Sequence, residues 1–133
     1  MNEYEEIREA IDGYLMKRFK YRRPLVYLTT NNVITTRRNS RIDLYLRLRR
    51  KESQFPPDCL IIARISFKKE HIGHGSHFVE FLAETALKYG FKHIGIESTN
   101  HKSQSFAEKL GFQSIDGSNY TVSVENLLSY FQD

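Results

Sequence analysis

The chain opens with apolar residues that recur every three or four positions, which is the spacing of one face of an α-helix. The residues on this face are Tyr4, Ile7, Ile11, Leu15 and Phe19. Asn2 precedes them as a potential N-cap, and Glu5 follows three residues later, as in a capping box. The pattern predicts an amphipathic helix over residues 3–19.

A period of two then replaces the helical period, and residues 25–67 are predicted to form strands joined by turns. Asn31-Asn32 and Asn39-Ser40 are typical turn pairs. Between residues 41 and 51, leucines and isoleucines alternate with polar residues, which indicates an antiparallel strand with one buried face and one exposed face. Residues 59–67 are apolar enough to form a central strand.

From Gly73 to Tyr89 the apolar residues again follow a helical period, and Gly90 is placed as a C-terminal stop. A strand over residues 91–98, a short helix over 101–110, a hairpin around Asp116-Gly117 and a last helical turn complete the expected order. The elements predict an α/β (α+β) domain with a mostly antiparallel mixed sheet and one strand–helix–strand crossover. Residues 1–133 are expected to form a single domain.

Composition narrows the class of protein without naming it. With 40% hydrophobic and 27% charged residues, the 133-residue chain has the balance of a globular protein, and no apolar run is long enough to span a bilayer. Its single cysteine, Cys59, excludes an internal disulfide. The acidic start lacks the pattern of a secretory signal, so we expect a cytoplasmic monomer or homodimer without membrane contact.

Charge is distributed unevenly along the chain. Residues 1–66 carry 14 Lys and Arg against 8 Asp and Glu, whereas residues 67–133 carry 6 against 8. A solvated surface explains such a bias in many proteins. The alternative is an anionic partner, which could be nucleic acid, an acidic protein surface or the phosphates of a cofactor. The arginines that would contact such a partner are Arg37, Arg38, Arg41, Arg47, Arg49 and Arg50.

The segment from Glu70 to Ser76 lies where a predicted strand leads into a predicted helix, and it contains Gly73 and Gly75. Glycine lets the backbone approach a ligand closely because no Cβ intervenes. The first turn of a helix also presents backbone N–H groups that lack partners at a positive dipole end. The segment therefore predicts a loop that binds phosphate groups.

Two spacings identify a family resemblance. The loop reads Glu70-x-x-Gly73-x-Gly75, similar to the Gln/Arg-x-x-Gly-x-Gly/Ala motif of the GNAT superfamily of acyl-coenzyme A-dependent N-acetyltransferases. Ile96 and Asn100 form an apolar-x-x-x-Asn pattern at the end of a predicted strand, and Gly111-Phe112 follows eleven residues after Asn100, as in the same family. The resemblance covers about residues 41–124.

The resemblance implies a sheet splayed open between its fourth and fifth strands, with the pantetheine arm of acetyl-CoA in the gap. It implies transfer of the acetyl group to a primary amine; we expect a protein or peptide amine because the first half is short and strongly charged. The implied donor-binding residues are Ile65, Ser66 and Phe67 along the arm, the amides of His71, Ile72, Gly73, His74, Gly75 and Ser76 at the pyrophosphate, and Asn100 on the opposite side.

The sequence departs from the family pattern at two positions. Glu70 replaces the Gln or Arg of the motif, and a carboxylate about 4 Å from a phosphate costs about 4 kcal/mol at an effective dielectric constant of 20. Ala107 occupies the position of the family's general-acid tyrosine and cannot donate a proton. The remaining catalytic candidates are Glu97 as general base and Tyr120 as a substitute acid.

Other interpretations of the same residues remain open. His71, His74 and His77 recur every three residues, but a cation there would compete with a phosphate, and we predict no metal site. Cys59 begins an apolar strand and is expected in the core. The alternative function is a catalytically impaired GNAT-like module that binds nucleic acid or an acidic partner through its arginine-rich first half.

Overall fold

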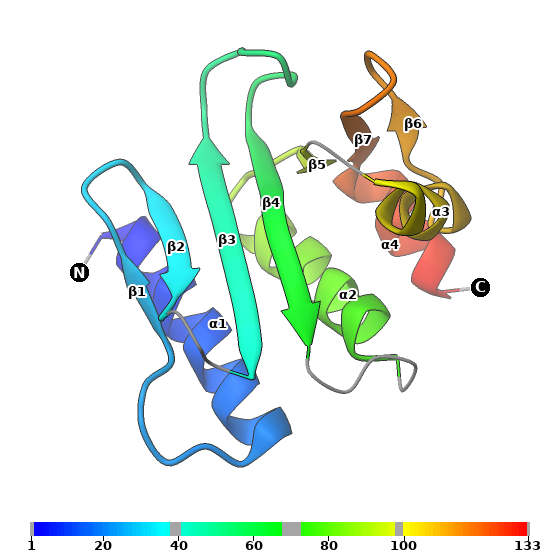
Figure 1. Ribbon diagram of the computed structural model, residues 1–133. Helices are drawn as coiled ribbons and strands as arrows, with labels where there is room; N and C mark the ends of the chain where they lie inside the picture. The colour runs from blue at the N-terminus through cyan, green and yellow to red at the C-terminus, as the bar shows by residue number, and fades with distance from the viewer. Residues whose placement is uncertain (1, 38–40, 68–72, 98–99, 133) are drawn as a thin grey trace.

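The computed structural model describes residues 2–37, 41–67, 73–97 and 100–132 (Figure 1). Its helices are α1 (Glu3–Phe19), α2 (His74–Lys88), α3 (His101–Lys109) and α4 (Val124–Gln132). Its strands are β1 (Val26–Leu28), β2 (Val33–Thr36), β3 (Ile42–Arg49), β4 (Cys59–Phe67), β5 (His93–Ile96), β6 (Gln113–Ser114) and β7 (Tyr120–Ser123).

The strands form one mixed sheet in the order β1-β2-β3-β4-β5-β7-β6. The β4–β5 pair is parallel and is connected through α2, whereas all other neighbouring pairs are antiparallel. The predicted fold class, including the single strand–helix–strand crossover, is confirmed. Because α2 connects parallel strands, its N-terminus follows the carboxyl end of β4, where the sequence predicts the phosphate loop.

The main core lies between the sheet and its helices. On β3 the buried residues alternate with half-exposed ones, as predicted, so that Leu44 and Leu46 face the helices. Ile7 and Ile11 of α1 and Phe78 of α2 pack against the same side of the sheet. The opposite face of β3, which we call the outer face, carries the polar residues of the alternation.

The first helix is joined to the sheet by a buried carboxylate. Asp12 is 6% exposed and accepts hydrogen bonds from the backbone N–H groups of Leu25, at 2.6 Å, and Val26, at 3.2 Å. Arg8 lies one helical turn before Asp12 and forms an ion pair with it at 3.6 Å. These contacts connect α1 to the beginning of β1 and leave the buried charge paired, as burial requires.

A β-bulge changes the alternation in the middle of β4. Leu46 is opposite Ile62 and Tyr45 is opposite Arg64, so Ala63 is an extra residue on β4. Ile62 faces the helices before the bulge, and Ile65 faces them after it. The sequence carries a signal for the bulge, because the inward apolar residues are two apart up to Ile62 and three apart between Ile62 and Ile65.

Strands β4 and β5 separate at the position of this bulge. β5 pairs with β4 from Cys59 to Ile62, and the N–H of Glu97 makes a last hydrogen bond to the carbonyl of Ile62 at 3.0 Å. From Ala63 to Phe67, β4 pairs with β3 on one side and, within the described residues, with no strand on the other. The predicted splay between the fourth and fifth strands is therefore confirmed (Figure 1).

Two local predictions compare differently with the structure. The last helical turn expected from the sequence is the nine-residue helix α4, and the hydroxyl of Ser123 caps its start by accepting from the N–H of Asn126. The turn predicted at Asn39-Ser40 lies outside the described residues. Among those residues, no helix combines the length and apolarity needed to cross a membrane.

Candidate active site

The open edge of β4 begins at the bulge and ends beside α2. At about 3.3 Å per residue, the stretch Ala63–Phe67 is about 17 Å long. Along it, Ile65 is half-buried and inward-facing, Ser66 is exposed, and Phe67 is buried. An unpaired strand edge offers backbone N–H and C=O groups to an extended ligand. The structure thus places Ile65, Ser66 and Phe67 along one continuous edge.

The N-terminus of α2 lies beyond that edge. Gly73 is the N-cap and adopts φ 75°, a left-handed conformation that favours glycine. The N–H of His77 makes the first helical bond, to the carbonyl of Gly73 at 3.1 Å. The amides of His74, Gly75 and Ser76 consequently have no carbonyl acceptor within the helix. His71 and Ile72, predicted for the same loop, lie outside the described residues.

Gly75 also has a packing role that the sequence did not reveal. A Cβ atom at this position would lie 3.4 Å from the ring of Phe106, a half-buried residue of α3. The missing side chain lets α3 approach the first turn of α2. Phe106 is therefore a site residue that spacing arguments missed, because its partner is 31 positions away in the sequence.

The C-terminal turn of α1 reaches the same helix end. The Nε of Arg18 donates a hydrogen bond to Nδ1 of His74 at 3.1 Å. The ring of Phe19 stacks on Phe67 with centroids 5.5 Å apart and lies 4.6 Å from the ring of His74. These contacts bring a guanidinium to the first turn of α2, close in sequence to Glu70, where the motif has lost a Gln or Arg.

Asn100 begins α3 on the other side of the gap. Its side-chain oxygen accepts from the N–H of Ser103 at 3.0 Å, while the Ser103 hydroxyl accepts from the N–H of Asn100 at 2.9 Å. This reciprocal capping box starts the helix and occupies the asparagine oxygen. The structure therefore gives Asn100 a local role at the helix end, in addition to its predicted place beside the donor.

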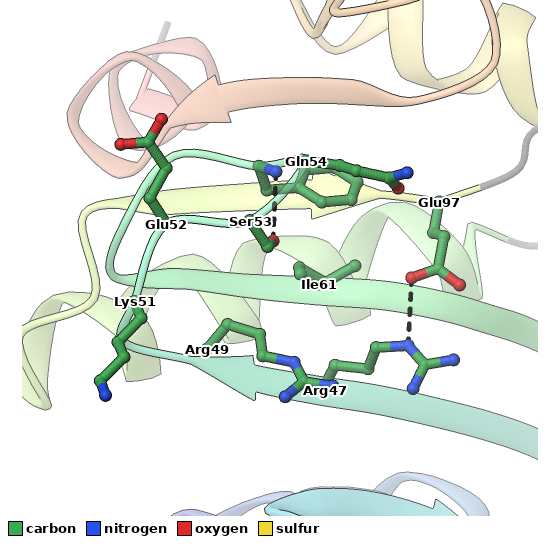
Figure 2. A pocket seen from close by; sticks show the side chains of 9 residues that line it. Arg47, Arg49, Lys51, Glu52, Ser53, Gln54, Ile61 and Glu97 are labelled. Atoms are coloured by element: carbon green, nitrogen blue, oxygen red, sulfur yellow. Dashed lines mark hydrogen bonds and ion pairs between the residues drawn. The ribbon is translucent and has the colours of Figure 1, made fainter.

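Glu97 lies at the level where β4 and β5 separate. It follows Ile96, which faces the helices, so its own side chain points to the outer face (Figure 2). There its Oε2 accepts from the Nε of Arg47 at 3.1 Å. Both side chains remain partly exposed, at 26% for Glu97 and 31% for Arg47. The carboxylate is thus held at the mouth of the gap by a partner from β3.

Tyr120 lies at the same level on the opposite face. It pairs in register with Ile96, so its side chain points toward the helices, and it is buried. Burial raises the pKa of its phenol above the usual value, and the negative charge of Glu108 on α3 raises this pKa further. The neutral phenol is therefore the form present near neutral pH. The two predicted catalytic residues flank the point of separation from opposite sides of the sheet.

A pocket of about 300 Å³ opens on the outer face next to Glu97 (Figure 2). β3 contributes Arg47 and Arg49, and the loop between β3 and β4 contributes Lys51 through Phe55. Ile61 of β4 forms part of its floor. The sequence indicated that the arginines share one strand face, but the loop that converts this face into a pocket was not predicted.

The arginines predicted to contact a partner are used in different ways. Arg50 turns inward, binding Glu3, Asp58 at 3.3 Å and the Tyr89 carbonyl at 2.7 Å. Arg47 is paired with Glu97, whereas Arg37, Arg41 and Arg49 are exposed. Arg38 lies outside the described residues. The charge distribution along the sequence did not reveal that Arg47 and Arg50 have partners within the protein, and contact of these arginines with another molecule stays a prediction.

Neither sulfur nor imidazole chemistry finds support in the described residues. Cys59 is fully buried beside Phe55 and Ile61, and burial raises the pKa of its thiol to about 12, so it stays protonated. His74 contacts Arg18, and His77 is exposed. No group of three His, Cys, Asp or Glu side chains that could hold a metal ion occurs in the described parts of the chain.

Comparison with solved structures agrees with this architecture, whereas the sequence comparisons give no match. No protein-family model matches the chain, and no curated protein matches it in sequence. Among solved structures, a GNAT-family acetyltransferase from Staphylococcus aureus matches 91% of this chain and 92% of its own, at 11% identity and a TM-score of 0.51.

Two further matches have higher TM-scores. A mutant of the AtaT toxin bound to the C-terminus of the antitoxin AtaR and to acetyl-CoA matches at 14% identity, 91% of this chain, 79% of its own and a TM-score of 0.56. The KacTA–DNA complex matches at 16% identity, 94% and 86% of the two chains and a TM-score of 0.55. The chain therefore has the fold of the GNAT acetyltransferases.

Proposed function

We propose that this protein is an N-acetyltransferase that moves the acetyl group of acetyl-CoA to a primary amine. The observation that carries the proposal is the open edge of β4 from the bulge at Ala63 to Phe67, together with the N-terminus of α2 that begins after Gly73. A GNAT-fold neighbour bound to acetyl-CoA supports the choice of donor.

In this proposal the donor lies along the edge in a defined direction. The pyrophosphate binds to amides at the start of α2, where the helix dipole favours negative charge. The pantetheine arm then follows Phe67, Ser66 and Ile65 as an added strand, and the thioester reaches the bulge. An unpaired backbone amide at the bulge is suited to polarise the thioester carbonyl.

The reaction needs proton transfers on two sides of the thioester. The amine nitrogen forms a bond to the carbonyl carbon, and the carbon–sulfur bond breaks. We assign removal of the amine proton to Glu97 on the outer face and protonation of the departing thiolate to Tyr120 on the helix side. The products are an amide and free coenzyme A, so atoms and charge balance.

Calorimetric titration with acetyl-CoA tests the binding part of the proposal. We expect saturable binding in the micromolar range, competed by coenzyme A because the nucleotide and pantetheine arm supply most contacts. Absence of binding at millimolar acetyl-CoA would end the proposal.

The catalytic assignments are tested by Glu97→Gln and Tyr120→Phe. Each is expected to lower kcat about 10²-fold with little change in acetyl-CoA affinity, because general acid–base catalysis contributes about 10²- to 10⁴-fold. Tyr130→Phe, an exposed position on α4, is the matched control. An unchanged kcat in either variant would remove that residue from the mechanism.

The alternative function, a module that binds nucleic acid or an acidic protein, is supported by the exposed arginines and by the DNA complex of one neighbour. It has less support because Arg47 and Arg50 have internal partners. Affinity for a nucleic acid through backbone contacts should fall steeply with salt. Tight, steeply salt-dependent RNA or DNA binding without acetyl-CoA binding would favour this alternative.

A further inference from the structure

The pocket beside Glu97 has walls of different charge. One wall consists of cationic residues on β3 and just after its end, namely Arg47, Arg49 and Lys51, whereas Glu52 lies on the opposite rim (Figure 2). Glu97 balances the charge of Arg47. Within the part of the chain that the structure describes, neither Arg49 nor Lys51 takes part in an ion pair. The β3 wall therefore retains uncompensated positive charge.

The loop that closes the pocket is held against the sheet. Phe55 is 3% exposed and packs where a Cβ on Gly95 would come within 2.6 Å of its ring. Ser53 and Phe55 are joined by a hydrogen bond from the Ser53 N–H to the Phe55 carbonyl at 3.0 Å. Since the ring fills the space above Gly95, the loop wall is fixed relative to Glu97 and the pocket is preformed.

Positive charge at this position has two consequences for an acceptor amine. It attracts an oxyanion elsewhere in the acceptor, which Arg can bind through charge-assisted hydrogen bonds. It also disfavours the ammonium form of the amine, because a neighbouring like charge lowers the pKa of an amine. The unprotonated amine is the nucleophile, so a cationic wall favours the reactive form.

We propose that this pocket binds the acceptor and selects primary amines whose own molecule carries a carboxylate or phosphate, with Arg49 and Lys51 as the oxyanion ligands. The inference rests on the proposed acetyltransferase function and names its substrate class. A volume of about 300 Å³ is at the lower end of ligand pockets, so it accommodates one residue-sized group. Apolar contacts with Ile61 and Phe55 would hold the carbon skeleton.

Matched pairs of acceptors test the selection. The peptide Glu-Ala-Ala-amide is compared with Gln-Ala-Ala-amide, and O-phosphoethanolamine with ethanolamine, by following release of the coenzyme A thiol. The anionic member of at least one pair is expected to have a kcat/KM about tenfold higher, because a hydrogen bond to a charged group contributes about 1.5 kcal/mol or more. The first pair reports on a carboxylate and the second on a phosphate.

The variant Arg49→Glu tests whether the preference for anionic acceptors arises in the pocket. It should raise KM for the preferred anionic acceptor about tenfold and leave acetyl-CoA affinity unchanged, and Arg49→Lys should retain much of the preference. Arg23→Glu makes the same charge change at an exposed position in the loop between α1 and β1 and should leave the preference intact. That loop lies at the opposite end of the sheet from the loop between β3 and β4 (Figure 1).

Equal rates within both pairs, or acetylation confined to other amines, would overturn the acceptor inference while leaving the acetyltransferase function in place. A preference that survives Arg49→Glu would overturn the assigned pocket. By contrast, loss of acetyl-CoA binding in the unmodified protein would refute the underlying function itself, so the two failures are distinguishable.

Discussion

At the scale of single residues, the start of α2 depends on one backbone conformation. Gly73 has φ 75° and is the N-cap residue of α2. Gly75 was predicted for the same reason, but its conformation lies within the helix and its missing Cβ accommodates Phe106. The two glycines therefore serve different purposes, although they are neighbours in one motif.

Gly73→Ala is expected to destabilise the protein by about 1–2 kcal/mol, because an L-residue pays that cost in the left-handed region. It should also weaken acetyl-CoA binding, since relief of the strain would shift the helix start. Gly13→Ala, in the middle of α1 with open space around its Cβ, is the control and should be neutral or stabilising. Chemical denaturation and calorimetry measure both effects; unchanged binding by Gly73→Ala would contradict the assigned role.

Cys59 provides a second test at this scale. Because its thiol is fully buried and its pKa is about 12, almost no thiolate is present at pH 8. Iodoacetamide is expected to leave the native protein unmodified and to alkylate it rapidly after denaturation, as read by mass spectrometry. Rapid modification of the native protein would contradict both the burial and the core assignment.

At the scale of elements, the end of α1 contributes to the site although it lies more than 50 positions before α2. Arg18 and Phe19 contact His74, and Phe19 also stacks on Phe67 at the end of β4. The predicted loop is thus supported by three elements. The positive charge of Arg18 lies at the first turn of α2, which follows in the sequence the glutamate that replaces the usual cationic or amide residue of the motif.

Arg18→Gln is expected to raise the Kd for acetyl-CoA about threefold to tenfold, because it removes a cation near the predicted phosphate position and its hydrogen bond to His74. Lys17→Gln removes the same charge from an exposed neighbouring position of α1 and is expected to change Kd little. If both substitutions raise the Kd equally, Arg18 acts only as a distant positive charge, and its contact with His74 does not matter for binding.

At the scale of the whole molecule, Arg50 connects parts of the chain that are distant in sequence. It binds Glu3 at the start of α1, Asp58 before β4 and the Tyr89 carbonyl after α2. Its guanidinium centre also lies 3.8 Å from the centroid of the Phe91 ring. The excess of positive charge in the first half of the sequence suggested that this residue contacts a partner, whereas the structure uses it to hold the end of β3 to both main helices.

Arg50→Ala is expected to lower the free energy of unfolding by about 2 kcal/mol, since several charge-assisted hydrogen bonds are lost at once. Arg50→Lys should restore little, because an ammonium cannot reproduce the planar fork. Arg49→Ala, at the adjacent exposed position, should stay within about 0.5 kcal/mol of the original protein. A denaturation midpoint unchanged by Arg50→Ala would show that these contacts add nothing to stability.

The sequence by itself determined the kinds of elements, their order and the phosphate-loop prediction. Those features depend on properties of neighbouring residues: helical or alternating periods, a glycine at a helix start, and the interval from Asn100 to Gly111. The change in spacing of the inward apolar residues, from two to three between Ile62 and Ile65, was also present in the sequence. Its interpretation as a bulge required the pairing register of β3 and β4.

Only the tertiary structure decided which distant groups meet. It placed Glu97 and Tyr120 on opposite faces at the point where β4 and β5 separate, brought Arg18 to α2, and turned Arg50 inward. It also folded the loop after β3 over Gly95 to form the pocket. Such contacts depend on how helices and strands pack across the sheet, and no period or spacing along the chain encodes that packing directly.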